Sequence, residues 1–303
     1  MIRVNEMDRR GVTLIELMIA LVISAALVAA IYRTFLTQER TYEVQDDVMD
    51  MQQNVRVALN EMTREIRMAG FGNIQSILPV TINGTTYNNV INPDTPTPGA
   101  LTILGGLGGS ATLTNIIPGT PPNPSVITVD SLSSSSGKLL FDTGNRKFIS
   151  IGGSECFAIT GMAGNTLTLN GNVNAAFKTD VNGNLTVPVS VFAIRAITYI
   201  VVPDTSGSPL LNPTLNRNEN LGDGNQPLAD GIENEAFSFF DGQGILLGNI
   251  PGNAPAPGVL ANIRSIQVTV TALTKSTDPQ MKVGDQRRRR TVVSNVLLRD
   301  MGL

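Results

Sequence analysis

The chain has 303 residues, of which 42% are hydrophobic and 16% charged, and its formal net charge at pH 7 is −3. This balance argues against a general nucleic-acid binder. The chain contains no histidine and a single cysteine, Cys156, which excludes a Ser-His-Asp triad, a His-ligated metal site and an intrachain disulfide. We therefore expect no enzyme, no metal and no cofactor, with Cys156 as a buried apolar side chain.

The chain begins with a polar, basic segment followed by an apolar one. Residues 1–11 contain Arg9 and Arg10, and residues 12–32 are almost entirely apolar. About 20 apolar residues in a helix, at about 1.5 Å each, span the roughly 30 Å of a bilayer core. We predict the transmembrane part of a helix over 12–33, with the preceding basic residues on the cytoplasmic side and the rest of the chain in the periplasm.

Glu16 is the exception in the apolar segment. A carboxylate within the membrane costs about 2.5 kcal/mol or more. One interpretation is a side chain that reaches back to the cytoplasmic interface. The other is a charge that pairs with a cation inside a protein assembly.

The residues around Glu16 resemble a known signal. Arg9-Arg10-Gly11 followed by Val12-Thr13-Leu14-Ile15-Glu16-Leu17 is similar to the class III signal of type IV prepilins and pseudopilins. The resemblance implies that residues 1–11 are a leader, that a prepilin peptidase cleaves after Gly11, and that Val12 becomes the N-methylated first residue. Val12 departs from the Phe that is usual in the family. The resemblance also implies that Glu16 pairs with the N-terminal ammonium of a neighbouring subunit, so that the two charges neutralise one another.

Beyond the membrane the pattern predicts an amphipathic continuation of the helix over 34–72. Apolar residues recur at spacings of three and four, at Val44, Val48, Met51, Val55, Ala58, Met62, Ile66 and Ala69. This spacing is typical of a helix with one apolar stripe. We expect the stripe to pack against the chain's own C-terminal sheet, with a coiled-coil seam as the alternative. The acidic residues, Glu65 among them, are expected off the stripe.

Glycine and proline mark where the helix ends. Neither occurs between Val12 and Ala69, whereas all 17 prolines and every glycine except Gly11 follow. We therefore predict one unbroken helix with a stop at Ala69–Asn73.

The remaining residues, 73–303, predict a β-rich globular domain. Short β-type runs bounded by turn residues lie at 77–82, 126–129, 147–151, 156–160, 166–169, 187–202, 236–240, 263–274 and 290–298. Met162–Asn165 is expected to connect a hairpin. The stretches 83–125 and 203–232 are expected to be long loops, with Asp180–Asn184 and Asp223–Asn225 as turns rather than calcium sites. The fold class is α+β, a long helix packed on a mostly antiparallel, pilin-like sheet domain.

Segments of the C-terminal part resemble PilW-type minor pilins. They are Phe192–Val202, Leu228–Phe240, Ile263–Val270 and Arg290–Asp300. The resemblance implies a minor pilin that primes or caps a type IV pilus. Its partners would be a prepilin peptidase, other minor and major pilins, the inner-membrane assembly platform and the lipid bilayer. Its location would be the inner membrane first, and then the pilus at the cell surface.

Two alternatives remain open. One is a minor pseudopilin of a type II secretion system, which shares the same N-terminal chemistry. The other is a membrane-anchored periplasmic enzyme or binding module, for which the sequence offers no catalytic constellation.

Charge is unevenly distributed towards the C-terminus. The run Arg287–Arg290 lies in a basic tail over 275–303, and the segment 204–241 holds seven acidic residues and one arginine. These could dock neighbouring pilins, or they could be a solvated hairpin before the last strand. No aromatic residues interleave with the arginines, so we do not expect a nucleic-acid partner.

Overall fold

A computed structural model describes residues 12–120, 122–174, 184–205, 212–278, 280–282 and 284–298 of the chain. The structure divides into two units, one extending to Met49 and the other beginning at Asp50. We describe each unit by itself.

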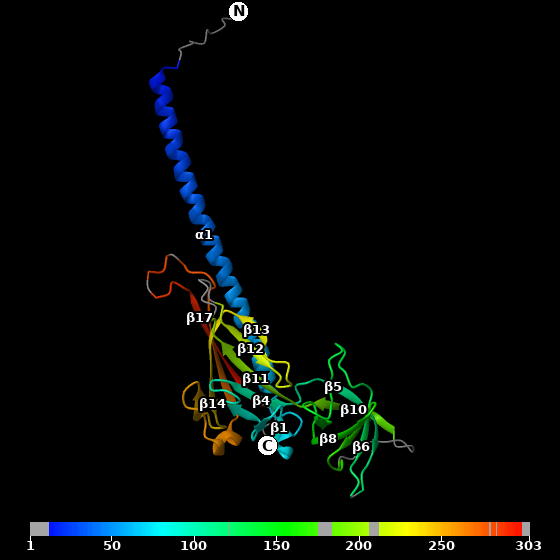
Figure 1. The fold of residues 1–303 in the computed structure, drawn as a ribbon. Helices are drawn as coiled ribbons and strands as arrows, with labels where there is room; N and C mark the ends of the chain where they lie inside the picture. Colours follow the sequence, from blue (N-terminus) through cyan, green and yellow to red (C-terminus); the bar gives the residue numbers. More distant parts are fainter. Residues whose placement is uncertain are drawn as a thin grey trace, which may run out of the picture. The chain divides into compact units, whose positions relative to one another are not determined.

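Helix α1 (Leu14–Arg67) is continuous over 54 residues (Figure 1). It ends where Gly70, Gly72 and Asn73 take positive φ angles of 84°, 98° and 56°, a backbone conformation that favours glycine and asparagine. The predicted unbroken helix and its stop are both confirmed.

In the second unit, α1 buries the predicted stripe. Met51, Val55, Ala58 and Met62 are at most 5% exposed, and each lies on the same face of the helix. Glu65 is also only 4% exposed. Its expected position off the stripe is therefore wrong, and the physical reason is a buried ionic network described below.

The strands of the second unit pair only in antiparallel fashion among the described residues, in four groups. One sheet has the order β13-β12-β11-β4-β3 and consists of β3 (Ile91–Pro93), β4 (Leu101–Gly105), β11 (Arg195–Val202), β12 (Thr214–Asn218) and β13 (Gln226–Asp230). A second has the order β15-β14-β16-β17 and consists of β14 (Ile232–Phe240), β15 (Leu246–Ile250), β16 (Ser265–Leu273) and β17 (Arg289–Leu297). The α+β class is confirmed.

A closed barrel is inserted into the first sheet. Its order is β10-β5-β6-β9-β8-β7, with β5 (Ser110–Ile117), β6 (Val126–Val129), β7 (Phe148–Ile151), β8 (Glu155–Ala163), β9 (Thr166–Leu169) and β10 (Asn184–Ala193). It has its own core, which includes Phe141, Ile149, Ile159 and Leu167. The strands on either side of the insertion, β4 and β11, are neighbours, and Gly105 lies opposite Arg195. The barrel therefore occupies the place of a hairpin turn.

Smaller elements complete the unit. They are the hairpin of β1 (Val80–Ile82) and β2 (Thr85–Tyr87), and the 3₁₀ helices η1 (Ile74–Ile77) and η2 (Pro257–Asn262).

Several sequence-based expectations about strands are wrong. The stretch predicted as a loop over 83–125 contains β2, β3, β4 and β5, and that over 203–232 contains β12 and β13. The prolines and glycines of these stretches lie between short strands. Because the stretches are rich in turn-forming residues overall, their composition predicted loops and gave no sign of the strands. The run at 187–202 is two strands in different sheets, separated at Ile194, and Ile77 belongs to η1. The connection at Met162–Asn165 is confirmed, since β8 pairs with β9 and Gly164 has φ 57°.

Candidate functional site

The first turn of α1 is closed by two side chains three residues apart. The backbone N–H and the hydroxyl of Thr13 donate to Oε2 of Glu16, at 2.9 and 3.0 Å, and the backbone N–H of Glu16 donates to Oγ1 of Thr13 at 3.3 Å. This reciprocal arrangement is a capping box. It begins the helix at Leu14 and leaves Val12 outside it. A carboxylate in the first turn is also favoured by the helix dipole.

Capping occupies only one oxygen of the Glu16 carboxylate. Within the described part of the chain, no donor contacts Oε1 of Glu16. An ionised carboxylate can accept hydrogen bonds at both oxygens. The geometry therefore allows Glu16 to cap its own helix and to receive a cation at the same time.

The structure describes only some of the residues predicted for this site. Val12 is 75% exposed and precedes the helix, and Glu16 is exposed in the first turn. Gly11, Arg9 and Arg10 lie outside the described residues. Thr13 was not predicted as a site residue, although Thr-x-x-Glu ahead of an apolar run is the sequence signal of a capping box.

The large apolar side chains along the first part of α1 are exposed. From Leu14 to Phe35 the large ones are exposed by 53% to 81%. Within the described residues, α1 is the one helix long and apolar enough to cross a membrane. An apolar surface of this extent requires lipid or protein neighbours.

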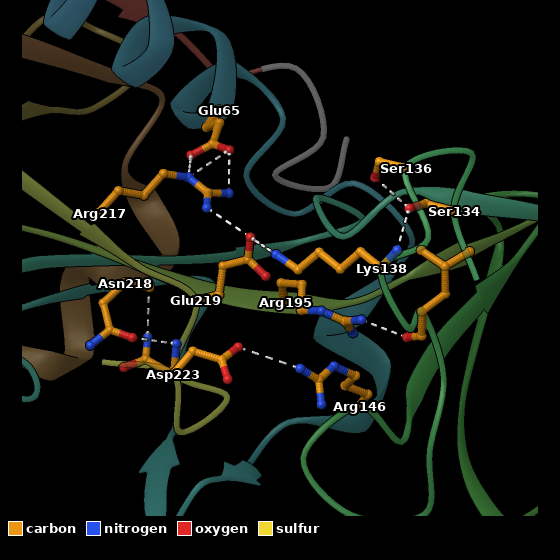
Figure 2. A network of polar contacts seen from close by, with 12 residues as sticks. Glu65, Ser134, Ser136, Lys138, Arg146, Arg195, Arg217, Asn218, Glu219 and Asp223 are labelled. Atoms are coloured by element: carbon orange, nitrogen blue, oxygen red, sulfur yellow. Dashed lines mark hydrogen bonds and ion pairs between the residues drawn. The ribbon is translucent and has the colours of Figure 1, made fainter. Parts of the chain in front are cut away.

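A second polar cluster lies in the other unit, where α1 meets the sheet (Figure 2). The guanidinium of Arg217 on β12 donates to both oxygens of Glu65, with Nη2 2.8 Å from Oε1, and the Tyr199 hydroxyl also donates to Glu65. Glu219 accepts from Arg217 at 2.8 Å and from Lys138 at 2.5 Å. An ionic chain thus runs from the helix through the sheet to the loop before β7.

The protonation states in this cluster follow from its pairs. Burial raises the pKa of Tyr199, and the nearby negative charge of Glu65 raises it further. Burial alone would raise the pKa of Glu219, but hydrogen bonds and charges from Lys138 and Arg217 outweigh it and lower that pKa. The charged members are paired with one another by short contacts, which is the pattern of a structural network.

The arginine run near the C-terminus makes contacts inside the chain. Arg287 is 4% exposed and donates to the carbonyls of Thr274 and Lys275. Arg288 lies 2.6 Å from Asp278, and Arg289 pairs at 2.7 Å with both Glu233 and Asp285. The charges considered for docking between subunits are therefore partly neutralised within the chain.

Two other sequence motifs were predicted to be turns rather than calcium sites. Asp223 pairs with Arg146 at 3.5 Å, and residues 180–183 lie outside the described residues. Among those described, no cluster of three or more His, Cys, Asp or Glu residues could hold a metal. Cys156 is buried, and burial raises the pKa of its thiol to about 12.

Comparison with known proteins identifies the N-terminal region. Residues 7–32 match the model of the prokaryotic N-terminal methylation motif. This motif indicates a prepilin-type protein, of the type IV pilin-like or pseudopilin kind, which is processed by a prepilin peptidase and assembles with other pilins. No curated protein and no solved structure matches the chain.

Proposed function

We propose that the chain is a minor pilin of a type IV pilus, of the PilW type, which helps to prime or cap the filament. Its role is structural rather than enzymatic. In this proposal Gly11 is the residue before the cleaved bond, Val12 is the methylated N-terminus, and the β-rich part is pilin-like. The protein enters the inner membrane with its N-terminus in the cytoplasm and reaches the cell surface in the pilus.

The observation that carries the proposal is the charge at Glu16. An acid in an otherwise apolar, exposed helix is unfavourable unless it finds a cation. The capping box uses only Oε2 of Glu16, and the ammonium of a neighbouring Val12 would be a cation at the same membrane depth. Two charges that are costly alone then neutralise one another when subunits stack.

The central test separates membrane insertion from assembly. Glu16→Val makes the segment more apolar, so we expect normal insertion and cleavage. In the filament, the variant would leave the N-terminal ammonium of a neighbouring subunit without its counter-charge, at a cost of about 3–5 kcal/mol. Incorporation should therefore fall at least roughly 10²-fold. The measurement is the amount of processed protein in sheared pili. Ser24→Val is the matched control, since it removes a polar group but no charge.

Three outcomes would contradict the proposal. If Glu16→Val enters filaments as well as wild type does, Glu16 is only a tolerated interfacial acid. If the mass of filament-associated protein shows a chain that does not begin at methylated Val12, the assigned cleavage site is wrong. A Glu16 variant that impairs secretion of hydrolases but not piliation would favour the type II secretion alternative.

A further inference from the structure

Strand β17 is the last strand of its sheet, and no described strand pairs with its other side. It pairs with β16 over nine residues in succession, without a register shift. Just after the strand, the N–H of Leu298 donates to the carbonyl of Arg264 at 3.0 Å. Because bonded and non-bonded pairs alternate in an antiparallel ladder, this bond shows that the even-numbered residues of β17 bond to β16. The backbone N–H and C=O groups of the odd-numbered residues therefore point to the open side, at Thr291, Val293, Asn295 and Leu297.

The other edges of the two larger sheets are protected. An open edge is a template for pairing with another chain, and proteins block it with prolines, bulges, short strands or a covering segment. β13 contains Pro227 and a register shift, and β3 has only three residues and ends at Pro93. At β15, the N–H of Asn249 donates to the carbonyl of Asn253 at 2.8 Å, so the following segment covers that edge. β17 contains no proline, and its charges are confined to its first two residues.

The side chains beside the open edge indicate what suits it. Val293 and Leu297 are 51% and 72% exposed, and they lie on the same face of β17 because side chains four residues apart in a strand point the same way. Arg289 is paired with two carboxylates, but Arg290 makes no ion pair within the described residues. The edge thus presents two exposed apolar side chains and, at its start, a cation that no described carboxylate neutralises.

A second copy of this chain does not suit the edge. In Figure 1, β17 runs in the same direction as the part of α1 that begins at Asp50, and the hydrogen bond from Asn54 to the carbonyl of Asp230, just before β14, agrees with this direction. Two copies joined antiparallel through β17 would have these helix segments in opposite directions, whereas both chains enter the membrane by the same end. A parallel pair would bring Arg289 and Arg290 of both copies together, and like charges beside one another destabilise a sheet.

We propose that β17 binds an extended segment of a different protein, which adds to the sheet as a further antiparallel strand. The segment carries an acidic residue opposite Arg290 and apolar residues opposite Val293 and Leu297, which are three and seven positions before the acid. Backbone hydrogen bonds supply the affinity in this mode of recognition, and the side chains select the partner. Antiparallel pairing is slightly more stable than parallel pairing and is the arrangement of every pair in this sheet. The inference goes beyond the proposed function and rests on it only for the direction in which the chain enters the membrane.

The first test uses the purified full chain in detergent and a fluorescent peptide with blocked ends, Val-Thr-Thr-Thr-Val-Thr-Thr-Glu. Fluorescence anisotropy measures its binding. N-methylation of the second valine and of the threonine two residues before it removes N–H groups that face β17, so it should abolish binding. N-methylation of the two threonines that flank the second valine is the matched control. Their N–H groups point away from β17, so binding should be unchanged.

Substitutions in the chain test the assigned edge. Val293→Pro removes an N–H on the open side and no bond to β16, so it should weaken peptide binding at least about tenfold. Val293→Thr keeps this N–H and is the matched control, with binding like that of wild type. Arg290→Glu should weaken binding about fivefold, and a peptide with lysine in place of glutamate should restore it. Thermal unfolding checks that each variant is folded.

A crosslink in cells tests for the natural partner. With the photo-crosslinker p-benzoylphenylalanine in place of Asn295, we expect a crosslink to a protein other than this chain. Mass spectrometry of the crosslinked segment should show the predicted spacing of two apolar residues and an acid.

The outcomes separate this inference from the proposed function. An absence of peptide binding overturns the inference, and so does binding that both N-methylated peptides share or that Val293→Pro leaves unchanged. A crosslink to a second copy, to a segment without the predicted spacing or to no protein also overturns it. Cleavage after Gly11 and recovery in filaments, measured in the same cells, report the proposed function independently. A processed, filament-associated chain whose β17 binds nothing would leave the pilin function standing and remove the strand addition.

Discussion

At the scale of single residues, burial determines on which charged side chains the fold depends, because a buried charge has no water to solvate it. Glu65 is 4% exposed on α1 and would be isolated there without Arg217 and Tyr199. Arg195 is 1% exposed at the start of β11, and its guanidinium donates to the carbonyls of Ile194 and Leu140. Both residues tie elements far apart in sequence to one another, because a buried charge is tolerated only with partners.

We expect Glu65→Gln to destabilise the fold by about 1–3 kcal/mol, because Arg217 then loses one of its two carboxylate partners in a buried position and keeps only Glu219. The free energy of unfolding, measured by urea denaturation of the full chain in detergent, reports the change. Glu61→Gln is the matched control. Its partner Arg64 is 69% exposed, and an exposed pair contributes about 1 kcal/mol or less. Equal effects of the two substitutions would contradict the buried-network interpretation.

The burial of the Glu235 carboxyl group predicts that the free energy of unfolding depends on pH. It is 4% exposed, and burial raises its pKa to about 8, although the N–H of Val201 donates to Oε1 at 3.0 Å. The folded state therefore retains a proton that the unfolded chain loses near the ordinary pKa of 4.5. The stability contributed by this proton is complete below pH 4.5 and is lost as the pH rises through about 8.

Glu235→Gln should remove that dependence. The amide oxygen can still accept from Val201, so we expect wild-type stability near pH 4 and a gain of a few kcal/mol over wild type at pH 9, at about 1.4 kcal/mol for each unit of pKa difference. Urea denaturation at a series of pH values measures it. Parallel pH profiles for the two proteins would show that Glu235 is ionised in the folded state.

At the scale of elements, the end of α1 is held against β4 by backbone contacts. Gly70 donates to the carbonyl of Leu104 and Gly106 donates to that of Phe71, each at 2.9 Å. Gly105 lies between these bonds, and a Cβ there would be 2.6 Å from the carbonyl oxygen of Met68. Only glycine allows the helix and the strand to approach so closely.

Gly105→Ala should therefore cost about 1–3 kcal/mol of stability, because the helix end must shift away from the strand. Gly258→Ala is the matched control: a Cβ at Gly258 meets nothing within 4 Å, and its effect should stay within about 0.5 kcal/mol. Thermal unfolding of both variants beside wild type measures the difference. A Gly105→Ala protein as stable as the control would mean that the contact is loose.

At the scale of the whole molecule, the described part of the second unit contains one closed barrel between two adjacent strands of a sheet. Because Gly105 and Arg195 are opposite one another, the ends of the insertion are as close as any antiparallel pair, about 5 Å. Insertions with adjacent ends are tolerated, since the parent sheet does not depend on the path between them. The barrel also has its own core.

Replacing residues 106–194 by an Asn-Gly turn should leave the remaining chain folded, because this turn suits a two-residue hairpin. Arg195→Thr accompanies the deletion, because the carbonyls of Ile194 and Leu140 that accept from Arg195 leave with the barrel. We expect a cooperative unfolding transition and normal cleavage at Gly11. Circular dichroism and the mass of the processed protein check these outcomes. An aggregated or unprocessed product would show that contacts such as Lys138 with Glu219 are required for the sheet to fold.

The sequence by itself determined the features that depend only on residues close to one another along the chain. The apolar segment, the unbroken helix, its stop at Gly70–Asn73 and the α+β class follow from periodicity and from the placement of glycine and proline. The same holds for the methylation motif, because its residues are consecutive. Only the tertiary structure decided which strands pair, that β5 to β10 close into a barrel, and that Glu65 is buried. These depend on contacts between residues such as Glu65 and Arg217, 152 positions apart, whose meeting no local pattern encodes.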